Sequence, residues 1–279
     1  MHVCSTITEC HSVRDQLQGS VALVPTMGNL HEGHLTLIRE AKLLADNVIV
    51  TIFINPMQFG ANEDLDSYPR TLKQDLEKLT SLDVDLVFTP SNAMIYPQGQ
   101  ENHTRILVPN LTNQYCGSNR PGHYTGVATI VLKLFNLTSP DIALFGKKDF
   151  QQLVVIKKMA IDLGLRIEIK GIDTVRENSG LAMSSRNQYL TEQERDIAQE
   201  LSKILSWAKS EVVAGNRLYH DLGVSAIDKL NAKGFEMEYF AISDQSKLQP
   251  ADETTTQIVI LAAGKLGATR LIDNLDFEL

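Results

Sequence analysis

The chain has 279 residues and a formal net charge of −8 at pH 7, with 26 lysines and arginines against 34 aspartates and glutamates. This length suits one large domain or two smaller ones. The acidic balance argues against wholesale binding to nucleic acid or to an anionic membrane, because both need a positive protein surface. We therefore expect small molecules, rather than nucleic acid or a membrane, as its partners.

The predicted compartment is the reducing cytoplasm. No apolar stretch approaches the roughly 20 residues that a membrane-spanning helix needs, and the N-terminus lacks the continuous apolar core of a secretory signal. Cys4, Cys10 and Cys116 are odd in number and lack the spacing of zinc ligands. Neither a disulfide framework nor a structural metal is indicated.

The first half of the chain alternates apolar runs with segments of helical periodicity. The expected strands are residues 21–24, 48–54, 85–89, 142–145 and 166–170, and the expected helices are residues 34–45, 72–79, 127–137 and 153–163. Strands that alternate with helices of this length predict a parallel sheet with helices on both faces, which is a doubly wound α/β domain. Such sheets bind ligands at the carboxyl ends of their strands.

The pattern changes after residue 171. Polar sequence leads to Thr191, which with Glu194 fits a capping box that opens a long helix. A second helix over residues 222–230 and strands over 237–242 and 257–263 follow. We expect two domains, an α/β domain over residues 1–174 and a smaller α+β domain over residues 175–279.

The strongest local signal is the histidine segment PTMGNLHEGH, residues 25–34, between the first predicted strand and helix. Its glycines allow close backbone approach, and exposed amides at a helix start favour an anion. His31 and His34 could donate hydrogen bonds to a phosphate or stabilise charge on phosphorus. Two surface histidines, or a partial metal site, remain the alternative interpretation.

Three other segments fall at predicted strand ends or at the domain junction: NPMQF (residues 55–59), the lysine segment FGKKDFQQ (145–152) and the serine segment MSSR (183–186). Two hydroxyls and a guanidinium in the serine segment suit phosphate oxygens. Each segment taken singly is more often an ordinary loop, turn or solvated charge pair. Their common placement favours one shared site.

In combination, PTMGNLHEGH, INPMQFG, RPGHYTGV, FGKKDFQQ and MSSRNQYL resemble the pantothenate synthetase (pantoate–β-alanine ligase) family. The resemblance implies a Rossmann-like ATP- and pantoate-binding domain, a C-terminal lid domain and a cytoplasmic homodimer. It also implies a two-step reaction with Mg²⁺ accompanying ATP. Pantoate and ATP give pantoyl adenylate and pyrophosphate, and β-alanine then releases pantothenate and AMP.

The resemblance also implies roles for residues at matching positions. His34 is assigned as an acid, His31 lies beside it on the phosphates, and Lys148 meets the phosphates; these three are the predicted catalytic residues. Gln58 and Gln152 would hold the pantoate and β-alanine substrates. The predicted ATP-binding residues are Met27, Gly28, Asn29, Leu30, His31, Glu32, Gly33, His34, Gly146, Lys147, Lys148, Asp149, Val175, Met183, Ser184, Ser185 and Arg186.

One position departs from the family pattern, because Lys147 stands where the family usually has a glutamate. Neighbouring residues at a helix start project in different directions. We therefore expect Lys148 to carry the functional ammonium and Lys147 to face solvent. The metal ligands are not determined by the sequence, although Asp149 is a candidate.

Three other functions share parts of this pattern. A nucleotidylyltransferase would use the same two histidines but would keep AMP in its product. A class I aminoacyl-tRNA synthetase has a similar histidine segment, but this chain is short and acidic and shows no anticodon-binding region. A non-catalytic adenine-nucleotide sensor would bind ATP without releasing pyrophosphate.

Overall fold

The computed structural model describes residues 1–60 and 63–279, which form two compact units. The first unit comprises Met1–Gly146 and Val155–Ile172, and the second comprises Lys147–Val154 and Asp173–Leu279. The elements in chain order are β1 (His2–Cys4), α1 (Ile7–Arg14), β2 (Val21–Thr26), α2 (Glu32–Leu44), β3 (Asn47–Ile52), the 3₁₀ helix η1 (Pro56–Gln58), α3 (Leu72–Ser81), β4 (Leu86–Phe88), α4 (Asn92–Ile95), α5 (Cys116–Asn119), α6 (His123–Thr138), β5 (Ile142–Gly146), η2 (Lys147–Asp149), α7 (Phe150–Asp162), β6 (Glu168–Ile172), η3 (Ser185–Tyr189), α8 (Glu192–Val213), α9 (Tyr219–Asn231), β7 (Phe235–Asp244), β8 (Gln257–Leu266) and β9 (Thr269–Glu278).

The first unit is built on a six-stranded parallel sheet with the strand order β1-β4-β3-β2-β5-β6. The chain runs from β2 to β4 towards one edge and from β5 to β6 towards the other. The order therefore reverses between β2 and β5, which is where open α/β sheets bind their ligands. The histidine segment follows β2, and the lysine segment includes the end of β5.

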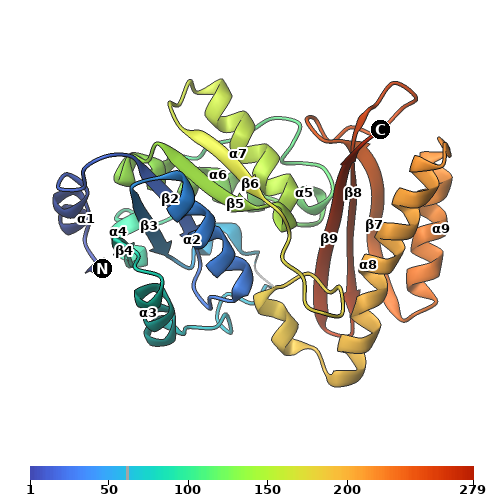
Figure 1. Cartoon of the computed structure of the whole chain (residues 1–279), viewed down its shortest axis with the longest axis horizontal. Helices are drawn as coiled ribbons and strands as arrows, with labels where there is room; N and C mark the ends of the chain where they lie inside the picture. Colours follow the sequence, from blue (N-terminus) through green and yellow to red (C-terminus); the bar gives the residue numbers. More distant parts are fainter. Residues whose placement is uncertain (61–62) are drawn as a thin grey trace. The chain divides into compact units, whose positions relative to one another are not determined.

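Helices cover both faces of this sheet. One face packs against α2 and α3, with alternate residues such as Ala22 and Val24 of β2 entering the same buried cluster as Leu37 and Ile38 of α2. Figure 1 shows α2 lying across β2 and β3. The other face contacts α1 and α6. The predicted doubly wound α/β fold is confirmed.

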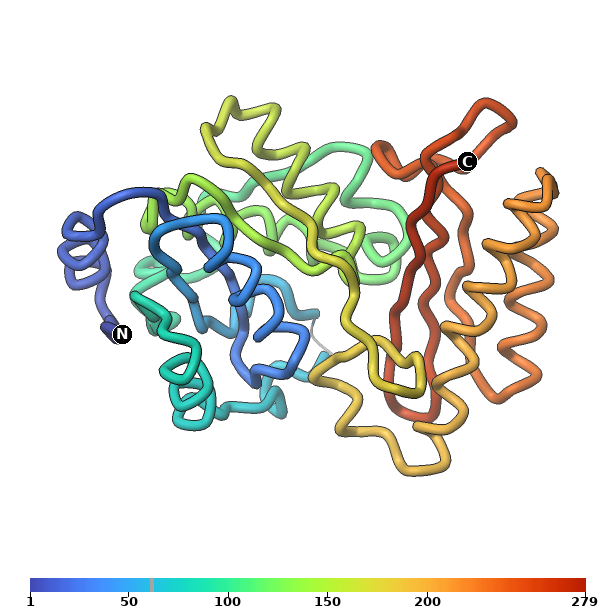
Figure 2. Tube along the Cα trace, in the orientation of Figure 1, coloured from blue at the N-terminus to red at the C-terminus, as the bar shows by residue number. Residues whose placement is uncertain are grey.

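The second unit contains a three-stranded antiparallel sheet in the order β7-β8-β9. Helices α8 and α9 pack against it, and a buried cluster joins residues such as Leu201, Leu205 and Leu222 of the helices to Ile258 and Ile260 of β8. β8 and β9 lie side by side in opposite directions, and β9 leads to the C-terminus (Figure 2). The capping box predicted at the start of α8 is present, since Glu194 N donates to Thr191 Oγ1 at 3.2 Å and Thr191 N donates to Glu194 Oε2 at 2.8 Å.

The predicted elements are confirmed with shifts at their ends. β3 ends at Ile52 rather than residue 54, and α6 begins four residues earlier than expected, at His123. β1, α1 and β9 were not predicted. No helix within the described residues is long and apolar enough to cross a membrane. The assignment of residues 1–174 to substrate binding and of 175–279 to a lid stays a prediction.

Candidate active site

The histidine segment turns sharply between β2 and α2. Gly28 and Asn29 have consecutive left-handed backbones, with φ of +81° and +50°. A Cβ on Gly28 would also lie 3.1 Å from Ile52 Cγ2. Glycine is suited to this position because an L side chain would add both backbone strain and crowding.

Four successive amides of the histidine segment are bound inside the protein. Gly28 N donates to Thr26 Oγ1 at 3.2 Å. Asn29 N and Leu30 N donate to the two carboxylate oxygens of Asp75, at 2.9 and 2.8 Å. His31 N donates to the His34 ring. These four amides precede Glu32, the first residue of α2, so anion binding by amides of the helix start stays a prediction.

The two histidines lie together at the start of α2. Their ring centroids are 4.1 Å apart with a 37° interplanar angle. His31 N donates to His34 Nδ1 at 3.3 Å, so Nδ1 acts as an acceptor. In a neutral imidazole the other nitrogen then carries the proton. His34 Nε2 is therefore a donor, which is the form needed to contact a phosphate oxygen.

Gln58 lies in the same unit, at the end of η1. Its Nε2 is 3.3 Å from Met27 Sδ in the histidine segment, and its Oε1 accepts from Asn55 Nδ2 at 3.0 Å. Asn55 is 1% exposed, and its Oδ1 accepts from the Tyr96 hydroxyl at 2.6 Å. Burial raises the pKa of Tyr96, which keeps this hydroxyl a donor. The hydrogen-bonded series Tyr96–Asn55–Gln58 therefore fixes the orientation of the Gln58 amide, with its oxygen towards Asn55 and its NH₂ group towards Met27.

Helix α6 supports η1 by backbone contact. Asn55 Nδ2 also donates to Gly126 O at 3.2 Å. A Cβ on Gly126 would lie 2.4 Å from Met57 O and 2.8 Å from Gln58 N. No side chain fits in that space, so the glycine sets how closely α6 approaches the residues around Gln58.

A cavity of about 530 Å³ opens beside Gln58. Arg120 on its wall donates from Nε to Glu63 Oε1 at 2.7 Å, and His123 Nδ1 lies 2.8 Å from Gln58 O. Burial alone would raise the pKa of Glu63, but the hydrogen bond and charge of Arg120 outweigh it and lower the pKa. The segment RPGHYTGV, residues 120–127, thus contributes to the wall of this pocket.

The lysine segment is anchored within the second unit. Asn274 Nδ2 on β9 donates to Lys147 O at 2.9 Å and to Lys148 O at 2.7 Å. Lys147 Nζ pairs with Asp173 at 2.7 Å and with Asp276 at 2.8 Å. The expectation that Lys147 faces solvent is therefore wrong, because two carboxylates hold its ammonium and leave only 27% of the side chain exposed.

The serine segment belongs to a short reversal of the chain in the second unit. Met183 N donates to Val175 O at 3.0 Å, which brings together two predicted ATP-binding residues. Arg176 donates to both carboxylate oxygens of Asp273 on β9, at 2.6 and 2.9 Å. Ser184 Oγ accepts from Arg186 N at 3.2 Å and caps η3.

The structure thus gathers the predicted residues into two groups. The first unit holds residues 27–34, Gln58 and Gly146, and the second unit holds residues 147–149, Gln152, Val175 and residues 183–186. The site contribution of each predicted residue stays a prediction. Sequence reasoning assigned no role to Asn55, Tyr96, Asp75 or Asn274. Only Asn55 lay inside a motif that could have identified it.

Known proteins resemble this chain over nearly its whole length. Residues 2–276 match the protein family described as pantoate-beta-alanine ligase. The pantothenate synthetase of Shewanella loihica is 53% identical over 259 residues, which are 93% of this chain and 92% of that protein.

Two crystal structures are also similar. That of pantothenate synthetase from Thermus thermophilus superposes with a TM-score of 0.92 at 39% identity, covering 99% of each chain. That of pantoate-beta-alanine ligase from Francisella tularensis, complexed with beta-gamma ATP and beta-alanine, has a TM-score of 0.84 at 37% identity, covering 99% of this chain and 97% of that one. The chain therefore belongs to the pantoate–β-alanine ligase family.

Proposed function

We propose that this chain joins pantoate to β-alanine at the expense of ATP, through a pantoyl adenylate. A pantoate carboxylate oxygen attacks the α-phosphorus of ATP, and the bond to pyrophosphate breaks. The amine of β-alanine then attacks the acyl carbon, loses a proton and expels AMP. Membership of the ligase family supports this reaction, and the single structural observation that carries it is the His31–His34 pair at the start of α2.

The histidine segment would bind the triphosphate mainly through side chains. The amides of Gly28, Asn29, Leu30 and His31 are already committed inside the protein. Charge builds on phosphorus and on the departing pyrophosphate during adenylation, and donors already in place are the groups that stabilise such charge. His34 Nε2 is such a donor. The N–H groups of Glu32 and Gly33, the first two residues of α2, would add to it, because the first N–H groups of a helix have no intrahelical acceptor.

Gln58 would hold pantoate. Asn55 occupies the Gln58 oxygen, so the amide nitrogen is the end that donates towards a carboxylate or hydroxyl oxygen. Gln152 at the start of α7 is the proposed second ligand. An amide pair can bind a hydroxy acid without adding positive charge, which leaves the carboxylate nucleophilic.

Lys148 and the serine segment, both in the second unit, would also bind ATP. Asn274 fixes the Lys148 carbonyl, so the backbone from which this ammonium projects is defined. Lys147 is committed to Asp173 and Asp276 and would stabilise the segment rather than bind phosphate. Val175, Met183 and residues 184–186 would line the nucleotide, with the Arg186 guanidinium and two hydroxyls suited to phosphate oxygens.

Mg²⁺ would accompany ATP and neutralise charge on its phosphates. No group of three His, Cys, Asp or Glu side chains suited to a metal ion occurs in residues 1–60 and 63–279. Mg²⁺ does not need such a group, because it keeps several waters and binds through substrate phosphates with one or two protein carboxylates. Asp149, exposed at the end of η2, is the carboxylate we assign to it.

We further propose a cytoplasmic homodimer in which residues 1–174 bind ATP and pantoate and residues 175–279 act as a lid. Cys4 and Cys10 are buried thiols that form no disulfide, which suits a reducing compartment. Burial raises the pKa of the Cys10 thiol to about 11, with a smaller contribution from Cys4, so this thiol stays protonated.

An assay of AMP release tests the function. Pantoate, ATP and β-alanine are supplied together and then omitted one at a time. We expect free AMP only when all three are present. Release of pyrophosphate without free AMP in the complete mixture would instead indicate a nucleotidylyltransferase, and ATP binding without pyrophosphate release would indicate a sensor.

A further inference from the structure

Two side chains of α3 hold the middle of the histidine segment. Asp75 is fully buried and accepts from Asn29 N and Leu30 N with its two oxygens. Lys78 Nζ donates to Leu30 O at 2.6 Å. The donor and the acceptor of one residue, Leu30, are therefore both bound by this helix. We call Asp75 and Lys78 the α3 clamp.

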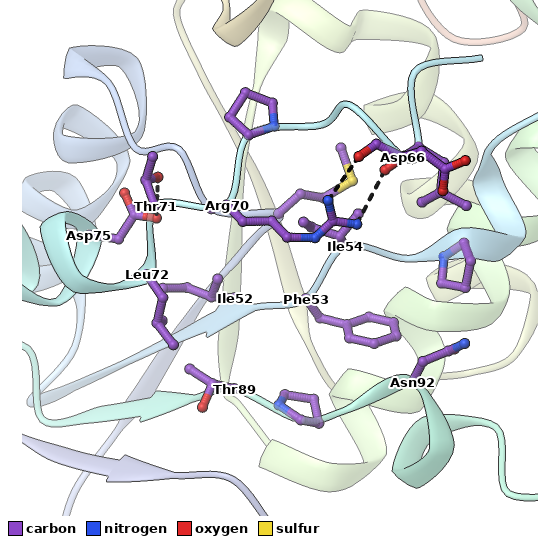
Figure 3. Close-up of a pocket in the computed structure, with 16 residues that line it drawn as sticks. Ile52, Phe53, Ile54, Asp66, Arg70, Thr71, Leu72, Asp75, Thr89 and Asn92 are labelled. Atoms are coloured by element: carbon purple, nitrogen blue, oxygen red, sulfur yellow. Dashed lines mark hydrogen bonds between the residues drawn. The ribbon is translucent and has the colours of Figure 1, made fainter.

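The clamp follows from the local structure of α3. Residues three apart on a helix lie on the same face, so both members reach the same segment. Asp75 sits in the first helical turn, where the helix dipole favours a negative group, and Thr71 Oγ1 donates to its Oδ2 at 3.0 Å. Figure 3 shows Thr71 and Asp75 together on the wall of a cavity of about 480 Å³.

Asp75 takes the place that an external anion could otherwise occupy. The left-handed backbones of Gly28 and Asn29 turn two successive N–H groups towards one point, and convergent backbone amides form an anion-binding concavity. Here the anion is part of the protein. The turn is held by Asp75, which lies 46 residues from Asn29 and 45 residues from Leu30 in the chain, and not by hydrogen bonds within the turn alone.

We propose that Asp75 and Lys78 are positioning residues for adenylation, which hold the Asn29–Leu30 backbone so that the imidazoles of His31 and His34 are in place before ATP binds. The inference rests on the proposed role of these histidines. Both clamp residues act on the backbone of Asn29 and Leu30, and we assign neither of them a contact with ATP. A displacement of about 1 Å in such a segment can cost about 10²-fold in rate, so a small change in the clamp has a large effect on chemistry.

Two substitutions weaken the clamp in different ways. Asp75→Asn keeps one oxygen but turns an NH₂ group towards an N–H that needs an acceptor. Lys78→Met keeps the apolar stem and removes the donor to Leu30 O. Because Lys78 is only half-buried, its variant is expected to fold even if the Asp75 variant does not.

Asp85→Asn is a matched control in the same unit. Asp85 Oδ2 accepts from Val48 N at 2.8 Å, at the start of β3. This carboxylate therefore also holds a backbone amide, but at the opposite end of the strands from the histidine segment. Asparagine keeps one oxygen for Val48 N, so this substitution reports the effect of removing the charge of an amide-binding carboxylate at a place away from the histidine segment.

The experiment measures the two half-reactions separately, with variants compared at equal folded fraction. Adenylation is followed as pantoate-dependent exchange of pyrophosphate into ATP, and the second half as β-alanine-dependent consumption of supplied pantoyl adenylate. For exchange we expect a fall of about ten- to a hundredfold in Asp75→Asn and of about two- to tenfold in Lys78→Met. Consumption of the adenylate should stay within about twofold of the unsubstituted protein, because a proximity-driven step depends less on the histidines.

The outcomes separate positioning from stability. Equal losses in both half-reactions, or exchange in both clamp variants no lower than in Asp85→Asn, would overturn the proposal. His34→Ala is measured in the same assay. If it retains exchange, the role of the histidine pair itself is wrong; if it loses exchange while the clamp variants keep it, only the positioning role is wrong.

Discussion

The histidine and lysine segments are both connections from a strand of the parallel sheet to a helix, yet they are held in opposite ways. In the first unit, Asp75 binds two N–H groups of the histidine segment. In the second unit, Asn274 donates to two carbonyl groups of the lysine segment. The first anchor is a carboxylate that accepts hydrogen bonds from backbone N–H groups. The second is a side-chain NH₂ group that donates hydrogen bonds to backbone carbonyl oxygens.

This difference bears on how each segment can meet a phosphate. The amides of residues 28–31 are already bound within the protein, so the main donors of the histidine segment to phosphate would be its imidazoles. The lysine segment has its carbonyl oxygens turned to a donor, which removes acceptors that would repel phosphate. In each case the anchor comes from a distant part of the chain, 45 residues away for Leu30 and 126 for Lys148. A strand-to-helix loop is thus shaped by tertiary contacts as much as by its own sequence.

The largest expected effect concerns the two neighbouring lysines. Lys148→Ala should lower adenylation by about 10²–10³-fold, the usual cost of removing one donor that stabilises the transition state. Lys147→Ala should lower it little, because Asp173 and Asp276 hold that ammonium. Rates of pantoate-dependent pyrophosphate exchange measure both. Equal impairment of the two variants would show that our assignment of the functional ammonium is wrong.

A smaller loss is expected from the anchor of the lysine segment. Asn274→Asp replaces the donating NH₂ group by an oxygen that faces the carbonyls of Lys147 and Lys148, so we expect adenylation to fall by about tenfold. Asn231→Asp is the control, because Asn231 in the same unit uses its oxygen to accept from Met237 N at 3.0 Å and keeps that acceptor. Equal exchange rates in the two variants would contradict the anchoring role.

On the histidine side, Gly126→Ala tests the support of Gln58. The new methyl group would lie 2.4 Å from Met57 O, so η1 must shift. Overpacking of this kind typically costs about 1–3 kcal/mol of stability. We expect the KM for pantoate to rise several-fold more than the KM for ATP, as steady-state kinetics would reveal.

The control for Gly126→Ala must come from another position. Gly122→Ala does not test the lack of space alone, because Gly122 has a φ of +84°. Gly146 has neither positive φ nor a neighbour within 4 Å of a built Cβ, but it belongs to the proposed site, so Ala128→Gly on the same helix serves as the control for stability.

The smallest effect is on stability. Burial lowers the pKa of Lys147, but its contacts with Asp173 and Asp276 outweigh burial and raise the pKa above its ordinary value. The ion pairs therefore stabilise the folded protein fully below about pH 10.4, and the stabilisation is lost as pH rises through the higher folded pKa. Lys147→Met should lower the thermal midpoint by no more than about 2–4 °C at pH 8. The difference from the unsubstituted protein should shrink above about pH 10.5; a difference that grows there would contradict the sign of the shift.

Sequence patterns predicted the parts of the fold that depend on local apolar periodicity. The run from Val21 to Val24 indicated a buried strand, and Thr191 with Glu194 indicated the start of α8. β1 was missed because its three residues become a strand only by pairing with β4. β9 was missed because it carries charged residues, whose partners are distant in sequence: Asp273 binds Arg176, and Asp276 binds Lys147.

The candidate site shows the same division. His31 and His34 stood out because their spacing and context suggest chemistry. The hydrogen bonds made by the backbone amides of residues 28–31 could not be predicted from the sequence. Asp75, which accepts two of them, lies far along the chain, in a helix whose sequence pattern is that of an ordinary amphipathic helix. The orientation of Lys147 was also predicted wrongly, because its partners Asp173 and Asp276 have no sequence signal that links them to it.

The most direct test of the account is adenylation by His34→Ala in the absence of β-alanine. The unsubstituted protein should exchange pyrophosphate into ATP when pantoate is present, and the variant should do so about 10²–10³-fold more slowly. The variant should still consume supplied pantoyl adenylate with β-alanine. Loss confined to the β-alanine step, with exchange intact, would contradict the claim that the histidine pair serves the first half of the reaction.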